Sequence, residues 1–142
     1  MRLIYVIYFM IVLLLSCTDE PNESSFNVSV KNASVELLEV EAYLQEEIVF
    51  NADLNPNENS PSCDYVDEKF RGIFITYCGT DSIVFKFSNN RVYISTDTNS
   101  GNFNFSSTRN PLLPNGGFQK SGSTYEFRIT QEDFENAFEL PE

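Results

Sequence analysis

Apolar and polar residues alternate along several short stretches of the chain, and this period of two is the pattern of half-buried β-strands. The alternation predicts strands over 26–30, 83–87 and 125–129, with a short edge strand over 103–105. Short runs of apolar residues predict further strands at 48–50 and 92–94. The run from Phe70 to Tyr77 is apolar at both alternate sets of positions, which predicts a central strand covered on two faces. The chain therefore reads mainly as β-structure.

The segment Val35–Leu44 fits two kinds of element. Leu38, Val40 and Ala42 alternate with other residues, two of them glutamate, which indicates a strand. Glu, Leu and Ala are also good helix formers, so a helix with one apolar stripe stays open. We favour the strand because the surrounding sequence is strand-like.

Turns and one helix divide these strands. Asn89-Asn90 lies between two β-rich runs and predicts a type I′ hairpin, because Asn tolerates positive φ. The Asn-, Pro- and Ser-rich segment Asp53–Asp64 predicts a loop. Thr130–Phe138 predicts a short helix, with Thr130 as the N-cap and Asp133 at the capping-box position.

Six to eight short strands followed by one helix predict an all-β fold for residues 26–142, taken as a single β domain. The order of strands, with a loop after residue 50 and strands again from residue 70, loosely resembles the immunoglobulin-like domains of small bacterial lipoproteins. This resemblance implies an immunoglobulin-like β-sandwich, although the buried tryptophan of antibody-type domains is missing. A lipocalin-like barrel is the alternative.

The first 16 residues have the composition of a signal peptide. Arg2 is followed by an uninterrupted apolar run of 13 residues, Leu3–Leu15. A membrane-spanning helix needs about 20 apolar residues, so this run is short for a span and suits the apolar region of a leader.

The four residues Leu14-Leu15-Ser16-Cys17 resemble the lipobox of bacterial lipoproteins. The resemblance implies that Cys17 carries lipid, that residues 1–16 are removed, and that 17–25 form an acidic tether. Asp19 and Glu20, close behind the cysteine, resemble the surface-export signal of some Gram-negative lipoproteins. We expect a lipid-anchored outer-membrane protein, on the periplasmic face or the cell surface.

The chain is strongly acidic, with 21 Asp and Glu against 9 Lys and Arg and a formal net charge of -12. All of the acidic residues follow Cys17. Such a charge repels nucleic acid, so no nucleic-acid partner is expected, and it favours basic partners. The membrane is contacted through the lipid anchor.

Two cysteines remain after Cys17. Cys63 and Cys78 are 15 positions apart, and an even pair in an oxidising compartment usually forms a disulfide. We predict that these two cysteines are cross-linked.

The segment after residue 52 has a weak likeness to an EF-hand calcium loop. Oxygen-bearing side chains recur at the alternate positions of such a loop, Asp53, Asn55, Asn57, Asn59 and, at its end, Asp64. Glu58 stands where the EF-hand needs glycine, and Pro56 stiffens the loop. An Asx-rich turn explains the segment better, so no metal and no other cofactor is expected.

Enzymatic chemistry has little support in this sequence. The chain contains no histidine, which removes the commonest general base and every Ser-His-Asp or Cys-His arrangement. We therefore expect no catalytic residues. The predicted function is that of a non-enzymatic envelope lipoprotein that acts by binding or as an accessory component, with an envelope protein or a glycan as partner. The alternative is an inhibitor or immunity-type lipoprotein that blocks a basic enzyme or toxin.

Three phenylalanines lie among polar residues in the late loops, at Phe103, Phe105 and Phe118. Exposed, they would form a sticky patch for a partner. We favour the other arrangement, in which they plug an open end of the sandwich.

Overall fold

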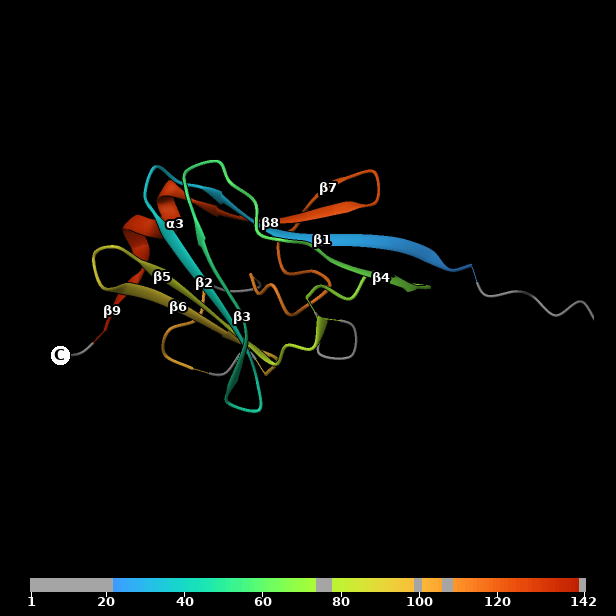
Figure 1. Ribbon diagram of the computed structural model, residues 1–142, viewed down its shortest axis with the longest axis horizontal. Coiled ribbons are helices and arrows are strands. Elements are labelled where there is room, and N and C mark those ends of the chain that lie inside the picture. Colours follow the sequence, from blue (N-terminus) through green and yellow to red (C-terminus); the bar gives the residue numbers. More distant parts are fainter. Residues whose placement is uncertain (1–21, 74–77, 99–100, 106–108, 141–142) are drawn as a thin grey trace, which may run out of the picture.

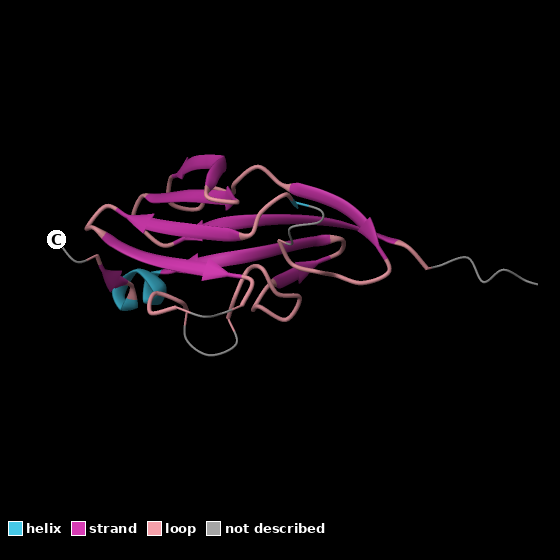
Figure 2. Ribbon diagram, turned by 90° about the horizontal axis from the view of Figure 1, so that it is seen from below, coloured by secondary structure: helices cyan, strands magenta, loops and turns pink. Residues whose placement is uncertain are grey.

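Two β-sheets lie face to face and bury the apolar sides of their strands between them (Figure 1). The computed structural model describes residues 22–73, 78–98, 101–105 and 109–140. Seen from a second direction, the long strands run nearly along the molecule, and helix α3 (Gln131–Asn136), drawn in cyan, lies near the C-terminal end of the chain (Figure 2).

The four-stranded sheet has the order β4-β1-β8-β7. Its strands are β1 (Ser24–Ala33), β4 (Cys63–Asp67), β7 (Gln119–Ser121) and β8 (Thr124–Thr130). β1 pairs in parallel with β8, so that Val30 lies opposite Phe127, and the other pairs are antiparallel. The first strand of the domain therefore lies beside the last long one.

The five-stranded sheet has the order β3-β2-β5-β6-β9 and is antiparallel throughout. Its strands are β2 (Leu38–Leu44), β3 (Glu47–Leu54), β5 (Ser82–Phe87), β6 (Arg91–Thr96) and β9 (Phe138–Glu139). Helix α3 (Gln131–Asn136) links β8 of one sheet to β9 of the other.

These sheets confirm the predicted all-β sandwich with a short C-terminal helix, while its immunoglobulin-like character stays a prediction. The alternative, a lipocalin-like barrel, is wrong because the strands form two separate sheets that do not close on each other. The described part of the chain holds nine strands, more than the predicted six to eight, since β7 and β9 are only three and two residues long.

The core forms where inward positions of both sheets meet. Leu38, Phe85, Phe127 and Ile129 are each 0 % exposed and belong to one cluster. Phe105 joins this cluster, 5.4 Å from Phe85 between ring centroids, and Phe118 packs against it. The predicted plugging role of these late phenylalanines is therefore confirmed for Phe105 and Phe118, while Phe103 is half-buried.

A smaller cluster covers the part of the four-stranded sheet where β1 begins. Phe26, Val28 and Tyr65 form its buried centre, and Phe70 stacks on Tyr125 with 3.8 Å between ring centroids. This cluster explains why the predicted strand Phe70–Tyr77 is wrong for its described part. Phe70–Ile73 is a loop that lays its aromatic and aliphatic groups on the sheet, and Gly72 (φ +77°) ends any extended run. Residues 74–77 lie outside the described residues.

The predicted loop Asp53–Asp64 is wrong at both ends. Asp53 and Leu54 complete β3, and Cys63 and Asp64 begin β4. β4 has only one fully buried side chain, Tyr65, so its sequence shows no apolar alternation. It is a strand because it pairs with β1.

The hairpin at Asn89-Asn90 is confirmed, but its predicted type I′ turn is wrong. Asn90 alone of the pair has positive φ (63°), and its N–H donates to the Phe87 carbonyl at 3.2 Å, as in a three-residue loop. The turn with two positive φ values joins β2 to β3 at Gln45 (51°) and Glu46 (71°). Neither residue type is typical of such a turn.

Within Val35–Leu44, the favoured strand is confirmed from Leu38 onward as β2. Phe103–Phe105, predicted as an edge strand, is wrong: it is a turn and an irregular segment, although the Ile94 N–H donates to the Phe103 carbonyl at 2.9 Å.

The predicted helix begins where expected but ends at Asn136, before Phe138, which starts β9. Thr130 is its N-cap, and the Asp133 side chain accepts a hydrogen bond from the Thr130 N–H at 2.6 Å, which completes the predicted capping box. None of the helices in the described part of the chain has the length and apolar character that a membrane crossing requires.

Candidate functional site

A disulfide joins the two cysteines of the domain, as predicted. Cys63 in β4 and Cys78 have Cα atoms 5.7 Å apart, within the ordinary range for a cross-link. The bond ties the first residue of β4 to the segment that leads into β5. It thereby holds together chain segments that belong to different sheets.

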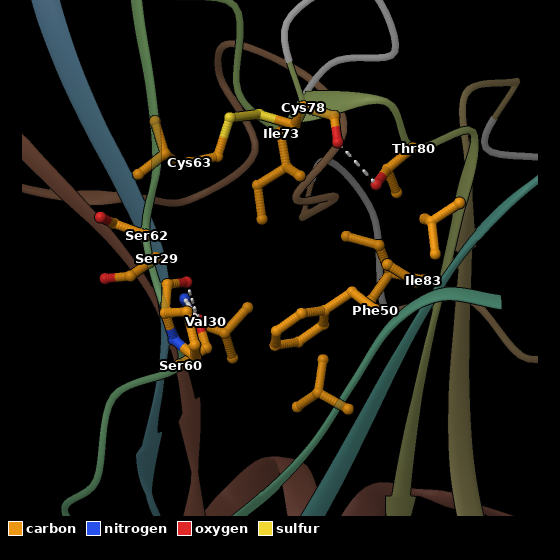
Figure 3. Close-up of a pocket in the computed structure, with 15 residues that line it drawn as sticks. Ser29, Val30, Phe50, Ser60, Ser62, Cys63, Ile73, Cys78, Thr80 and Ile83 are labelled. Atoms are coloured by element: carbon orange, nitrogen blue, oxygen red, sulfur yellow. Dashed lines mark hydrogen bonds between the residues drawn. A yellow bond between two sulfur atoms is a disulfide. The ribbon is translucent and has the colours of Figure 1, made fainter.

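A cleft of about 260 Å³ opens beside this disulfide, between the two sheets (Figure 3). Cys63 and the segment from Ser60 lie along one side with β1, and Phe50 of β3 and Ile83 of β5 lie along the other. The full lining is Val28, Ser29, Val30, Val40, Ala42, Val49, Phe50, Ser60, Pro61, Ser62, Cys63, Ile73, Cys78, Thr80 and Ile83.

Two hydroxyl groups in the lining of the cleft are already hydrogen-bonded within the protein. Ser60 Oγ accepts a hydrogen bond from the Val30 N–H at 3.0 Å and donates to the Pro61 carbonyl at 2.9 Å. Thr80 Oγ1 donates to the Cys78 carbonyl at 3.3 Å. Because these hydroxyls are satisfied and most of the lining is aliphatic or aromatic, the cleft suits apolar groups rather than a charged ligand.

Strand β3 forms the outer edge of the five-stranded sheet next to this cleft. Its register shifts between Ala42, which faces Phe50, and Tyr43, which faces Ile48, so Val49 is the extra residue of a β-bulge. Ile48 is 55 % exposed and Val49 is 49 % exposed. Two aliphatic side chains are thus presented at an edge to which no other strand of the described residues is paired.

The exposed edge of β3 is acidic at both ends of the strand and in the turn before it. Glu46 and Glu47 are exposed, and so is Asp53 toward the other end of the strand. None of the ion pairs among the described residues includes any of the three. The edge therefore combines exposed aliphatic groups with uncompensated negative charge.

A charged network lies on the outer face of the same sheet. Glu41 is only 5 % exposed, accepts from Lys86 Nζ at 2.7 Å and accepts the Tyr43 hydroxyl proton at 2.5 Å. The hydrogen bond from Lys86, followed by that from Tyr43, lowers the pKa of Glu41 below its usual 4.5. The same contacts with Glu41 raise the pKa of Lys86 and the pKa of Tyr43.

The five residues with EF-hand-like spacing have separate surroundings. Asp53 lies opposite Glu39 in the β2–β3 pair, and Asp64 accepts from the Asn27 side chain on β1. Asn55 donates to Glu58 at 2.9 Å, which is the local bonding of an Asx-rich turn.

The other two asparagines are also placed separately. Asn57 has positive φ (66°), and Asn59 donates to Glu126 of β8 at 2.8 Å. Among the described residues, no three Cys, Asp or Glu side chains are grouped as metal ligands would be. Cys17, the predicted lipidation site, lies outside the described residues.

The cleft could not be predicted from the sequence, because its walls come from segments far apart in the chain. One local signal does exist. Ile48-Val49-Phe50 is a run of three apolar residues that breaks the alternation of β3, so all three cannot face the core of a regular strand.

Comparisons with protein-family models, with curated proteins and with solved structures found no match to this chain.

Proposed function

We propose that this protein is a membrane-anchored, non-enzymatic lipoprotein of the bacterial envelope, and that its β-sandwich acts by binding a partner or as an accessory component. The observation that carries the binding role is the apolar cleft beside the exposed edge of β3. Its lining offers shape and mostly apolar surface, while the hydroxyls of Ser60 and Thr80 are already engaged. Such a site favours recognition over chemistry.

The anchoring part of the proposal is supported by the order of residues around Cys17. An apolar run ends in Leu14-Leu15-Ser16-Cys17, and β1 begins seven positions later at Ser24. β1 begins at the opposite end of the molecule from β9 (Figure 1). A short tether would therefore reach the domain at one end, leaving the sheet edges accessible to a partner.

Replacing the cysteine tests the anchor directly. Cys17→Ala should move the protein from the membrane fraction to the soluble fraction and abolish labelling by a fatty-acid analogue, because the thiol is the group that would carry the diacylglyceryl lipid. Thr18→Ala is the matched control and should leave both measurements unchanged. A Cys17→Ala protein that stays in the membrane fraction would refute the lipoprotein reading.

The alternative function is that of an inhibitor or immunity-type lipoprotein that blocks a basic enzyme or toxin. The net charge of -12 favours it, since complementary charge steers association. Affinity capture at low and high salt distinguishes the two. One basic enzyme that is captured only at low salt supports the inhibitor, and a partner retained at high salt supports apolar contact at the cleft.

A further inference from the structure

We propose that the edge of β3 is a docking site for an extended segment of a partner protein with alternating basic and apolar residues, which joins the five-stranded sheet as an additional strand. This inference rests on the proposed binding function and specifies its site and the chemistry of the partner. Three features support it: the unpaired edge of β3, the apolar cleft beside that edge, and the negative charge along it.

β3 is the longest edge strand in the described part of the chain. It has eight residues, whereas the other edge strands β4, β7 and β9 have five, three and two. An edge strand presents unpaired N–H and C=O groups along its outer side, and natural sheets commonly block such groups with Lys, Pro or very short strands. β3 contains neither Lys nor Pro. A β-bulge also blocks an edge, but the one in β3, at Val49, leaves Phe50–Leu54 in regular register with β2.

The cleft provides a place for alternate side chains of an added strand. Val49 and Phe50 of β3 line it together with Ser60 and Cys63 across the gap, and Phe50 points into it (Figure 3). Successive side chains of a strand point to opposite faces of the sheet. A strand paired with β3 would thus place every second side chain toward the cleft, where apolar groups are favoured.

The remaining side chains of that added strand would lie on the outer face, where the charge is negative. Asp53 lies on that face of β3, directly across from Glu39 of β2, and Glu46 and Glu47 add negative charge where the edge meets the turn. Opposite charges directly across a strand pair stabilise it, and like charges destabilise it. The complementary residues on the partner are therefore Lys and Arg.

The same charges disfavour a second copy of this chain as the occupant. Two β3 strands paired edge to edge would bring the acidic residues of both copies onto one ribbon with no basic residue among them. A partner segment in which basic and apolar residues alternate would place its apolar side chains toward the cleft and its basic side chains toward the acidic residues.

The test uses the purified full-length chain and synthetic eight-residue peptides. The probe alternates Lys and Val, a second peptide has the same composition in two blocks, and a third alternates Glu and Val. Binding is measured by calorimetry at low and high salt. The alternating Lys-Val peptide should bind at least about tenfold more tightly than either of the others, a difference of about 1.4 kcal/mol.

Strand addition has its own signature in hydrogen exchange. The Lys-Val peptide should slow exchange of backbone amides within Glu47–Leu54, because those that faced solvent become hydrogen-bonded. Equal protection over all strands, or protection elsewhere with β3 unchanged, would overturn the proposal.

Val49→Lys should weaken binding of the Lys-Val peptide by about tenfold or more, since the new lysine repels the lysines of the peptide at the edge. Val49 is half exposed, so the variant should fold, and an unchanged melting curve checks this. Val35→Lys makes the same change at a side chain that is 72 % exposed in the turn between β1 and β2, and it should bind as the unaltered chain does.

The other outcomes contradict the inference. Equal binding of the alternating and block peptides would mean that the cleft binds apolar groups without strand addition. Dimerisation of the chain that Val49→Lys abolishes would mean that a second copy occupies the edge of β3. Either result leaves the proposed function standing, because membrane anchorage is decided separately by Cys17→Ala. A Cys17→Ala chain that stays in the membrane fraction, together with intact peptide binding, would refute the lipoprotein function and leave the docking site standing.

Discussion

Gly116 makes the closest backbone approach in the loop that closes one end of the sandwich. A Cβ atom at this position would lie 1.7 Å from the Asn110 carbonyl oxygen, far inside van der Waals contact. Asn110 is itself 0 % exposed, donates to the Thr96 carbonyl at 2.8 Å and accepts from the Leu112 N–H at 2.9 Å. The Asn110 side chain thus stabilises the buried loop through its hydrogen bonds, and the loop can pack this closely only because Gly116 has no Cβ atom.

Gly116→Ala should destabilise the domain by about 3 kcal/mol or more, because the buried backbone around Asn110 cannot move aside without losing its hydrogen bonds. Gly122→Ala is the control. That site has positive φ (62°) with nothing within 4 Å of a Cβ, so only the backbone strain of about 1 kcal/mol applies. Urea unfolding of both variants measures the difference. Equal losses of free energy of unfolding would show that the approach of Gly116 to the Asn110 carbonyl is not tight.

Glu41 links stability to pH. The pKa of Glu41 is lowered in the folded state. Its charge therefore adds to the free energy of unfolding above the ordinary pKa of about 4.5, and this contribution is lost progressively as pH falls from that value through the lowered folded pKa. Glu41→Gln should cost about 1–3 kcal/mol near pH 7, since Lys86 loses a charged partner, and less near pH 3.5, where part of this contribution is already lost.

The check is the unfolding midpoint in urea at both pH values. Glu68→Gln, at an exposed position, should leave both midpoints unchanged and serves as control. A Glu41→Gln penalty that is equal at the two pH values would contradict the role of its charge.

At the scale of elements, the disulfide is the strongest single constraint near the cleft. Replacing both Cys63 and Cys78 by Ser should lower the free energy of unfolding by about 3 kcal/mol, the value expected for closing a 15-residue loop. Denaturant unfolding of the double variant measures this. Free thiols in the untreated protein, or no change in stability on reduction, would contradict the cross-link.

The elements that could be predicted from the sequence are those that carry their own pattern. β5 and β8 alternate cleanly, and Thr130 with Asp133 marks the start of α3. β4 and the Phe70–Ile73 loop could not be predicted, because pairing with β1 makes one a strand and packing on Tyr125 makes the other a loop. Both depend on residues distant in the chain.

The same division applies to the site. The Cys63–Cys78 pair follows from counting cysteines, and the acidity of the chain is read from composition. The cleft and the edge position of β3 depend on strand order, which no local pattern specifies. Only the three consecutive apolar residues Ile48-Val49-Phe50 hint at them.

At the scale of the whole molecule, the proposals describe an acidic sandwich held to a membrane at one end and open to a partner along β3. Negative charge keeps the domain from anionic lipid headgroups and nucleic acid and attracts basic partners. Anchorage is the claim on which the envelope role depends, because it places the domain in an oxidising compartment suited to its disulfide.

The intact mass of the full-length gene product, purified from the membranes of the cells that make it, tests this claim most directly. We expect a chain that begins at Cys17 and carries the added mass of a diacylglyceryl group on that residue. A chain that retains Met1–Ser16, or one cut elsewhere with an unmodified Cys17, would contradict it.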